Sequence, residues 1–444
     1  MVNALSLTYE LATEPSWGGI LTTSSHLTNK KINRFTHIPQ TQNDLVDRIR
    51  MMQKLAMEHG SCVGGRCVGQ DALCAVYSVT YDIDQEKGTD YHERFIHFLS
   101  RVQDEDLCVA GAMTDAKGNR SLTPIEQDDP DIFLRLVEKR ADGIVVRGAK
   151  AHISQAAFAH EMLILPSEAM NQTNKAYAIS FAISPDAPGI THVFEGAAPN
   201  QRRKTASEID FGNANYGVHG ATLVIFDDVF IPNERIFMCE EYQFSGSMVV
   251  RFADMHRLGF AACKSGHCRL TAGACALAAE YNGVEKAAHI KEKLTDIILN
   301  GDLTFGTVLG SATLGYPSPS GTYFPDRSLV NSAKIQGVSS LWEIGKIASD
   351  IVGGIVCTAP TGKDLESPEV GQWVKKYYRG KSPDSAEKRI RLARLVEFLI
   401  GQGSIIPAEG ANGGGGIATQ RLSIRGTTNF DELKQKAKKI AGIE

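Results

Sequence analysis

Residues 247–283, SMVVRFADMHRLGFAACKSGHCRLTAGACALAAEYNG, form the stretch that decides the fold. The stretch contains no proline and closes on Asn282-Gly283, which is a typical C-terminal stop for a helix. It therefore predicts one long helix that carries His256 and Cys263. At about 3.6 residues per turn, these two side chains return to nearly the same face, roughly 10 Å apart along the axis.

A second cysteine-bearing segment, SCVGGRC at 61–67, adds Cys62 and Cys67. Together the two segments supply three thiols and one imidazole, which suit a buried metal or iron–sulfur centre. The distance between His256 and Cys263 is wide for one zinc ion but suits two corners of an iron–sulfur cluster. Structural zinc modules use shorter spacings. The alternative is four unrelated residues, since free cysteines are commonly buried.

Composition excludes several classes of protein. The chain has 444 residues, 43% hydrophobic and 22% charged, as expected of a globular protein with two or three domains. Its net charge of −4 offers no footprint for nucleic acid or an anionic membrane. No apolar run approaches the roughly 18 residues of a membrane span, and the first residues lack the pattern of a secretory signal. Nine scattered cysteines indicate reduced thiols in a cytoplasm. Those outside the two segments are expected to be core residues: Cys74, Cys108, Cys239, Cys268, Cys275 and Cys357.

Hydrophobic periodicity divides the chain into three parts. The first hundred or so residues predict helices, for example at 42–60 and 91–106. From near Gly111, short runs rich in valine, isoleucine and threonine predict an antiparallel sheet or barrel, with strands at 143–153, 161–166, 177–184, 191–196 and 222–232. After Met238 the helical pattern returns, with further helices expected at 289–300, 339–352, 386–401 and 430–442.

This order of helices, strands and helices is the plan of the acyl-CoA dehydrogenase fold. FDDVFIPNERIF at 226–237 resembles the segment that leaves the β domain of that fold. More specific motifs resemble the 4-hydroxybutyryl-CoA dehydratase family, which is allied to the flavin-dependent 4-hydroxyphenylacetate 3-hydroxylases. They cover nearly the whole chain: LTYELA, INRF, SCVGGRCVGQDA, YDIDQEKGTDYH, GAMTDAKGNR, DGIVVRGAKAH, MHRLGFAACK, AAEYNG and DIVGG.

The resemblance implies an α+β fold of the acyl-CoA dehydrogenase type with three domains. These are an N-terminal helical domain at 1–109, a flavin-binding antiparallel β domain at 110–240 and a C-terminal helical bundle at 241–444. The family begins with a few dozen further residues, so the first domain is expected to be shorter than the family's.

The resemblance also implies FAD beside a 4Fe-4S cluster held by three cysteines and one histidine. The matching positions are Cys62, Cys67, Cys263 and His256. The family spaces its first two cysteines as C-x3-C, whereas this chain has C-x4-C, where two glycines would let the loop bulge. The matching flavin positions are Met113, Thr114, Arg120, Ser121, His152, Ser154, Gly353 and Gly354.

The family converts 4-hydroxybutyryl-CoA to crotonyl-CoA and isomerises vinylacetyl-CoA to the same product through a substrate radical. His256 is expected to be both a cluster ligand and the general base, since a neutral imidazole accepts protons near pH 7. Lys264 matches a family lysine that would hold the thioester or hydroxyl by a charge-assisted hydrogen bond. Glu409 matches a family glutamate near the substrate. Without the resemblance, these would be a satisfied helix histidine, a solvated lysine and a residue of an ordinary polar loop.

Two positions depart from the family. Phe260 stands where the family has a tyrosine, and a position close to Ala221 stands where it has a glutamate. A buried acid–base group typically contributes about 10²–10⁴-fold in rate. The prediction is a cytoplasmic, homotetrameric FAD- and 4Fe-4S-dependent dehydratase and isomerase of an acyl-CoA. Two alternatives stay open: a reduced-flavin monooxygenase of the 4-hydroxyphenylacetate 3-hydroxylase type, and a flavin- and cluster-binding protein that has lost catalysis.

Overall fold

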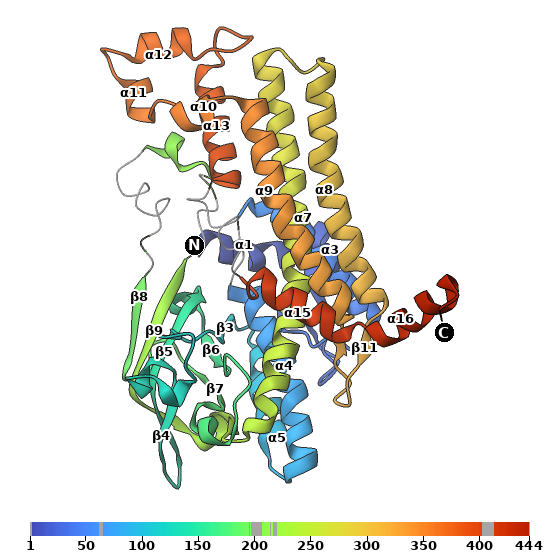
Figure 1. The fold of residues 1–444 in the computed structure, drawn as a ribbon. Helices are drawn as coiled ribbons and strands as arrows, with labels where there is room; N and C mark the ends of the chain where they lie inside the picture. Colours follow the sequence, from blue (N-terminus) through green and yellow to red (C-terminus); the bar gives the residue numbers. More distant parts are fainter. Residues whose placement is uncertain are drawn as a thin grey trace.

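The computed structural model describes residues 2–61, 65–194, 196, 207–213, 215, 220–401 and 413–443. Helices come first, two β-sheets follow, and an upright helical bundle completes the molecule (Figure 1). The first part contains α1 (Val2–Thr13), α2 (Pro15–Leu21), the hairpin β1 (Thr22–Ser24) and β2 (Lys31–Asn33), α3 (Gln42–His59), α4 (Gly65–Lys87) and α5 (Tyr91–Asp104).

The strands of the middle part are β3 (Val109–Ala112), β4 (Arg135–Lys139), β5 (Gly143–Ser154), β6 (Glu161–Ile164), β7 (Ile179–Ile183), β8 (Ile190–Phe194), β9 (Ala221–Pro232) and β10 (Ile236–Cys239). The last part contains α7 (Ser245–Asn282), α8 (Ala288–Thr313), the hairpin β11 (Tyr316–Pro317) and β12 (Tyr323–Phe324), α9 (Arg327–Val352), α10 (Ile355–Thr358), α11 (Gly362–Glu366), α12 (Gly371–Tyr377), α13 (Ala386–Ile400), α15 (Ile417–Thr427) and α16 (Phe430–Ala441).

The long helix predicted around His256 is α7, and it forms the axis of the molecule (Figure 1). It ends where the sequence indicates, because Gly283 adopts a left-handed conformation (φ +73°) and its N–H bonds the carbonyls of Ala279 and Glu280. The lower half of α7 packs on α3 and α4, and its upper half packs on α8 and α9. One helix thus joins the N-terminal helices to the bundle.

The middle part consists of two four-stranded sheets, ordered β10-β7-β6-β3 and β4-β5-β9-β8. Apolar residues of both sheets share one core, in which the rings of Phe181 and Phe226 meet edge to face at 6.2 Å. The pairs are antiparallel except for β3 and β6, which are parallel. The expectation of a purely antiparallel arrangement is wrong for this pair. The chain passes through the other sheet between the two strands, and this long crossover lets it return in the same direction.

Helix α4 lies against strand β3 at backbone distance. A Cβ on Gly69 would come within 1.9 Å of the Val109 carbonyl oxygen, and one on Gly111 within 2.6 Å of that of Val68. Only glycine permits this approach. The first turns of α4, which carry Cys67, are therefore fixed against the β part.

Helix α4 begins at Gly65, so Cys67 stands in its first turn and not in a bulged loop. The rest of that loop lies outside the described residues. Four of the cysteines expected in the core are buried there (Cys74, Cys108, Cys268 and Cys275) and Cys239 is partly buried. The expectation was wrong for Cys357, which is exposed near the end of the short α10. In the described part of the chain, no helix is both long and apolar enough to cross a membrane.

Candidate active site

The predicted thiol ligands that the structure describes lie on adjacent helices. Cys67 on α4 and Cys263 on α7 are buried in the same core. The Sγ atom of Cys263 lies 3.8 Å from Nδ1 of His267, one turn further along α7. Cys62 lies outside the described residues. Among those described, no three histidine, cysteine, aspartate or glutamate side chains gather as a metal site. The complete ligand set therefore stays a prediction.

His256 is held by a buried carboxylate that the sequence analysis did not single out. Nδ1 of His256 lies 2.8 Å from Oδ2 of Asp71 on α4. The other carboxylate oxygen of Asp71 accepts a hydrogen bond from Arg48 on α3, and both of these side chains are 1% exposed. The imidazole also stacks on Phe252, with 5.8 Å between ring centroids. Three helices thus meet in a chain of polar contacts that ends at His256.

A glycine turn covers the other side of the imidazole. Gly414 adopts φ +72°, and a Cβ there would come within 3.0 Å of Cδ2 of His256. Its carbonyl accepts hydrogen bonds from Nε of Arg257 (3.2 Å) and from Nε2 of Gln420 (3.2 Å). The predicted Glu409 lies outside the described residues, but the turn that follows it is anchored against His256.

Two buried lysines flank Phe260, which lies one turn along α7 from His256. Nζ of Lys334, on α9, lies 3.4 Å from the centroid of the phenyl ring, and Nζ of Lys264 lies 5.3 Å from it. Both lysines are at most 2% exposed. The aromatic face attracts each ammonium group, and two buried cations together favour negative charge nearby. Lys264 therefore lies in a setting that suits an oxyanion.

The predicted flavin positions of the β part lie on two neighbouring segments. Lys150 on β5 donates to the carbonyl of Met113 at 2.9 Å and pairs with Asp115, so it fixes the backbone on both sides of Thr114. After Lys150 the register of β5 shifts, and His152 adopts φ +60° with its side chain exposed. Bulges of this kind re-aim side chains and are frequent beside active sites.

Ser154 and Ala221 form a directly opposed pair in the β5–β9 ladder. The position where the resemblance implies a lost glutamate thus adjoins a predicted flavin residue. Arg120 and Ser121 lie together in an exposed turn, where the Ser121 hydroxyl donates to Oδ1 of Asn119 at 2.8 Å. The structure does not bring Arg120 and Ser121 into contact with His256.

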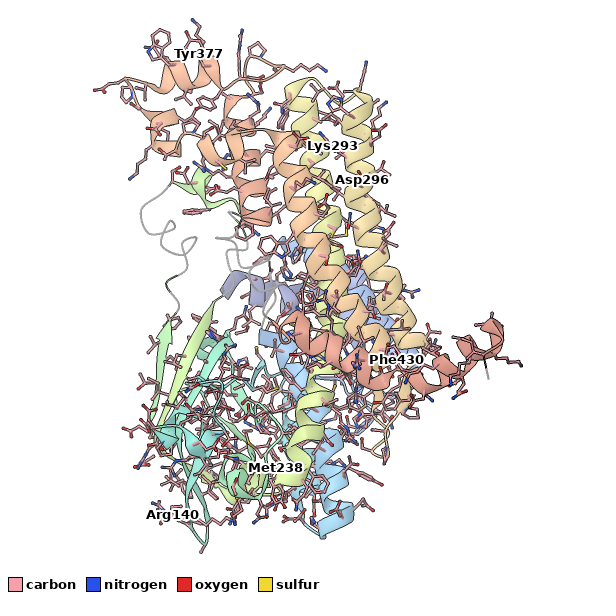
Figure 2. The ribbon with its side chains drawn as sticks, viewed as in Figure 1. Arg140, Met238, Lys293, Asp296, Tyr377 and Phe430 are labelled. Carbon is pink, nitrogen blue, oxygen red and sulfur yellow. The ribbon has the colours of Figure 1, made fainter. Side chains whose placement is uncertain are left out.

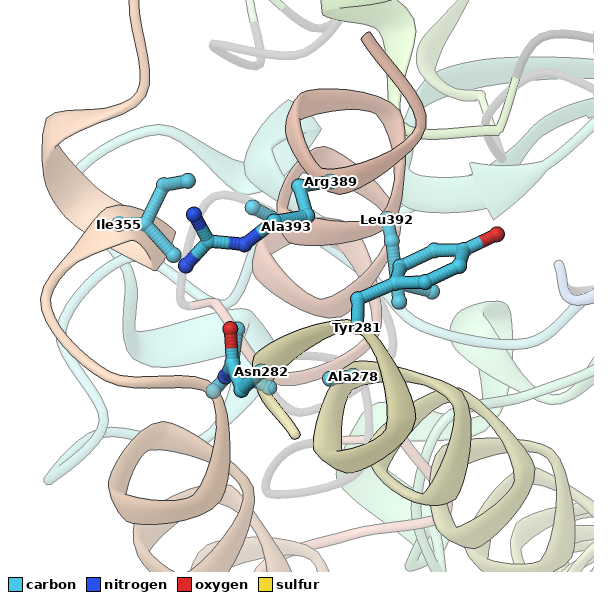
Figure 3. A pocket seen from close by; sticks show the side chains of 8 residues that line it. Ala278, Tyr281, Asn282, Ile355, Arg389, Leu392 and Ala393 are labelled. Carbon is cyan, nitrogen blue, oxygen red and sulfur yellow. The ribbon is translucent and has the colours of Figure 1, made fainter. Parts of the chain in front are cut away.

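Gly353 and Gly354 form the turn between α9 and α10, with φ +82° at Gly353. Nothing lies within 4 Å of a Cβ built on either residue, so another molecule can approach this backbone closely. The turn adjoins a small pocket between the end of α7 and helices α10 and α13 (Figure 3). The pocket begins at Ala278, 22 residues or about 33 Å along α7 from His256, so it is separate from the histidine site.

Family models locate this architecture among known proteins. The N-terminal model of 4-hydroxyphenylacetate 3-hydroxylase matches residues 1–238, and its C-terminal model matches residues 245–442. The 4-hydroxybutyryl-CoA dehydratase/vinylacetyl-CoA-Δ-isomerase of Clostridium aminobutyricum is 41% identical over 454 residues, covering 100% of this chain and 92% of that protein. The chain belongs to the 4-hydroxybutyryl-CoA dehydratase family.

Solved structures agree with this membership. The oxygen-tolerant archaeal 4-hydroxybutyryl-CoA dehydratase from N. maritimus has a TM-score of 0.97 at 38% identity, covering 100% of this chain and 88% of that one. The oxygenase component of 4-hydroxyphenylacetate 3-monooxygenase, complexed with FAD and 4-hydroxyphenylacetate, has a TM-score of 0.86 at 23% identity, with 99% and 90% covered. Butyryl-CoA dehydrogenase from Megasphaera elsdenii has a TM-score of 0.52 at 16% identity, with 86% and 81% covered. The acyl-CoA dehydrogenase-like fold is therefore confirmed.

The residues present fit the two groups that the dehydratase resemblance implies. The described cluster candidates are two buried thiols and one imidazole, on helices that pack against each other. Thiolates and imidazole are suitable iron ligands, and a metal-bound histidine typically donates its other ring N–H to a carboxylate, as His256 can to Asp71. The open backbone at Gly353 and Gly354 leaves room for part of a large cofactor.

Arg48, Asp71, His267 and Lys334 are candidate functional residues that sequence reasoning missed. Asp71 follows Cys67 by four residues, so a helix that starts at Gly65 would have placed the two side chains on one face. Lys334 lies on the apolar face of α9, and a lysine in such a sequence pattern indicates a buried cation. No local signal identifies Arg48, because its partner belongs to another helix.

Proposed function

We propose that this protein dehydrates 4-hydroxybutyryl-CoA, or a closely related acyl-CoA, to crotonyl-CoA and isomerises vinylacetyl-CoA. The observation that carries this proposal is the largely buried imidazole of His256, whose Nδ1 faces Asp71. Its Nε2 can therefore accept a proton. One turn along α7, Lys264 and Lys334 flank the ring of Phe260. The full-length likeness to an enzyme named for these two reactions supports this proposal. We also propose that the protein binds FAD and a 4Fe-4S cluster, assembles as a homotetramer and is located in the cytoplasm.

The chain's own residues can perform the proton and charge steps. While it is not bound to iron, Nε2 of His256 would take the C2 proton of the acyl thioester, which the neighbouring carbonyl makes acidic. Lys264 and Lys334 would stabilise the negative charge that develops on the thioester oxygen. Phe260 carries no ionisable group, so it supplies no proton to the departing hydroxyl. When bound, the flavin would exchange an electron with the substrate and the cluster would polarise the leaving hydroxyl.

Cys62, Cys67, Cys263 and His256 would hold the cluster. Met113, Thr114, Arg120, Ser121, His152 and Ser154 would contact the flavin. Gly353 with Gly354 would adjoin the ADP half of a flavin held by a neighbouring subunit. Glu409 would lie near the substrate. The solved relative with FAD supports the flavin assignment only through the shared fold.

The test is an anaerobic assay of the purified protein with 4-hydroxybutyryl-CoA and with vinylacetyl-CoA, alongside iron and flavin analysis. His256→Gln is expected to lower both activities by about 10²–10⁴-fold. His289→Gln, on an exposed position of α8, is the matched control and should leave both unchanged. Inactivity of the wild-type protein on both substrates would overturn the proposal.

The same preparation separates the alternatives. A monooxygenase would consume oxygen and reduced flavin while hydroxylating 4-hydroxyphenylacetate, and it would need no iron. A protein that had lost catalysis would contain iron and flavin but turn over neither acyl-CoA. If the protein isomerises vinylacetyl-CoA but does not dehydrate 4-hydroxybutyryl-CoA, the family groups replaced at Phe260 and near Ala221 are the ones that serve the departure of hydroxide.

A further inference from the structure

Asp71 occupies a position in which each of its carboxylate oxygens has one defined partner. Oδ1 accepts from Nη2 of Arg48, and Oδ2 faces Nδ1 of His256 at 2.8 Å. Arg48 and Asp71 are each 1% exposed, so water does not compete for either oxygen. The geometry of the three groups is therefore fixed by helices α3, α4 and α7 together.

The direction of each hydrogen bond follows from the chemistry of the groups. A guanidinium is only a donor, so the oxygen that faces Arg48 must accept. A carboxylate paired with it is only an acceptor, so the ring nitrogen that faces Oδ2 must carry the proton. In neutral His256 the proton then lies on Nδ1, and Nε2 keeps its lone pair.

We propose that Asp71, oriented by Arg48, is a positioning residue that fixes His256 in the Nδ1–H tautomer and reserves Nε2 for ligand binding or proton acceptance. What Nε2 then binds rests on the proposed function, but the tautomer is a property of the chain alone. The proposal distinguishes this network from a buried ion pair that only joins helices. Such a pair would stabilise the fold without setting the ring proton.

Asp71→Asn gives the sharpest test. The amide oxygen would turn to Arg48, because that donor needs an acceptor, and the NH₂ group would face His256. Nδ1 would then have to accept, and the ring proton would move to Nε2. Histidine-selective ¹⁵N NMR of the apoprotein, with His256→Gln to assign the resonances, should show Nδ1–H in the wild type and Nε2–H in Asp71→Asn.

A double variant tests the part played by Arg48. In Arg48→Met/Asp71→Asn nothing claims the amide oxygen, so the amide can flip and accept from Nδ1–H again. The Nδ1–H tautomer should return in the double variant. Arg48→Met alone should keep it, because Asp71 remains. A residue that acts only through stability would show no such rescue, since removing both partners would destabilise the fold at least as much as Asp71→Asn.

Iron binding provides a second readout in the anaerobically loaded protein. Loss of a carboxylate partner of a metal-binding histidine typically costs about 10–100-fold in affinity. Asp71→Asn should therefore lose iron to a chelator faster than the wild type, and the double variant should recover part of the difference. The matched control is Glu161→Gln, which neutralises a buried carboxylate between Arg101 and Arg235. It should change neither the tautomer nor iron retention.

The outcomes separate this proposal from the proposed function. An Nε2–H tautomer in the wild type, or an unchanged Nδ1–H tautomer in Asp71→Asn, would overturn the inference. If Asp71→Asn fails to fold, the wild-type tautomer and that of Arg48→Met still test it. If the tautomers behave as described but neither acyl-CoA is turned over, the positioning role stands and the proposed reaction fails.

Discussion

Gly414 brings a backbone turn against the imidazole of His256, and this contact yields a prediction at the level of one residue. Gly414→Ala should strain the backbone, because φ is +72°, by about 1–2 kcal/mol. It should also push the ring through a Cβ contact of 3.0 Å with Cδ2. We expect activity to fall by at least about tenfold, since small displacements of a catalytic group are costly. The measurement is kcat, together with the unfolding midpoint.

Gly416→Ala is the matched control for that variant. Gly416 lies in the same turn with φ −71°, and nothing lies within 4 Å of a Cβ built on it. It should leave both kcat and the unfolding midpoint nearly unchanged. An equal loss of activity in both variants would mean that the loop itself, and not its contact with His256, limits the rate.

Local sequence predicted some site residues and could not predict others. His256 and Cys263 were found because helical spacing within one element places them on one face. Asp71 was missed because the start of α4 was taken for a loop, which hid its relation to Cys67. Arg48 depends on three helices meeting, and no pattern within α3 carries that information.

The packing of α7 on α3 gives a prediction for a whole element. A Cβ on Gly266 would come within 2.3 Å of the carbonyl oxygen of Gln53, so Gly266→Ala should force the two helices apart. Overpacking of this kind typically costs about 1–3 kcal/mol. Gly273, also on α7, is exposed with no atom within 4 Å of its Cβ position. Gly273→Ala should instead stabilise the protein by up to about 1 kcal/mol. The free energy of unfolding in urea is measured for both variants and the wild type. A Gly266→Ala variant more stable than the wild type would contradict the prediction.

Elements were predictable where their own residues determine them. The end of α7 follows from Asn282-Gly283, since glycine takes the left-handed cap at no steric cost. The parallel pairing of β3 with β6 was not predictable in the same way. It depends on which sheet each strand joins, and no pattern within a single strand specifies that.

At the scale of the molecule, α16 projects from the body (Figure 1), and Phe430 lies at its start (Figure 2). Phe430, Leu433 and Ile440 follow helical spacing on one face and are 48%, 50% and 87% exposed. We expect this face to contact a second subunit of the proposed homotetramer. Leu433→Ser/Ile440→Ser should lower the mass found by light scattering, whereas Gln435→Ser, off this face, should not. Equal masses for both variants would exclude α16 from the interface.

The stability of the whole fold should depend on pH through buried histidines. Burial lowers the pKa of His59 and of His26 from 6.5 to about 4. Between these values the unfolded chain binds more protons than the folded one, so stability falls as the pH drops from 6.5 to 4. For His59, which is 1% exposed, the full loss is about 3 kcal/mol. Asp254, whose pKa burial raises, acts in the opposite direction, so variants must be compared at each pH.

The measurement is the free energy of unfolding in guanidinium at a series of pH values from 7.5 to 4.5. This free energy should fall less steeply with decreasing pH in His59→Gln than in the wild type. The exposed control His289→Gln should leave the dependence on pH unchanged. If His59→Gln left the dependence on pH unchanged, the pKa of His59 would be the same in the folded and the unfolded chain, and the prediction would be wrong.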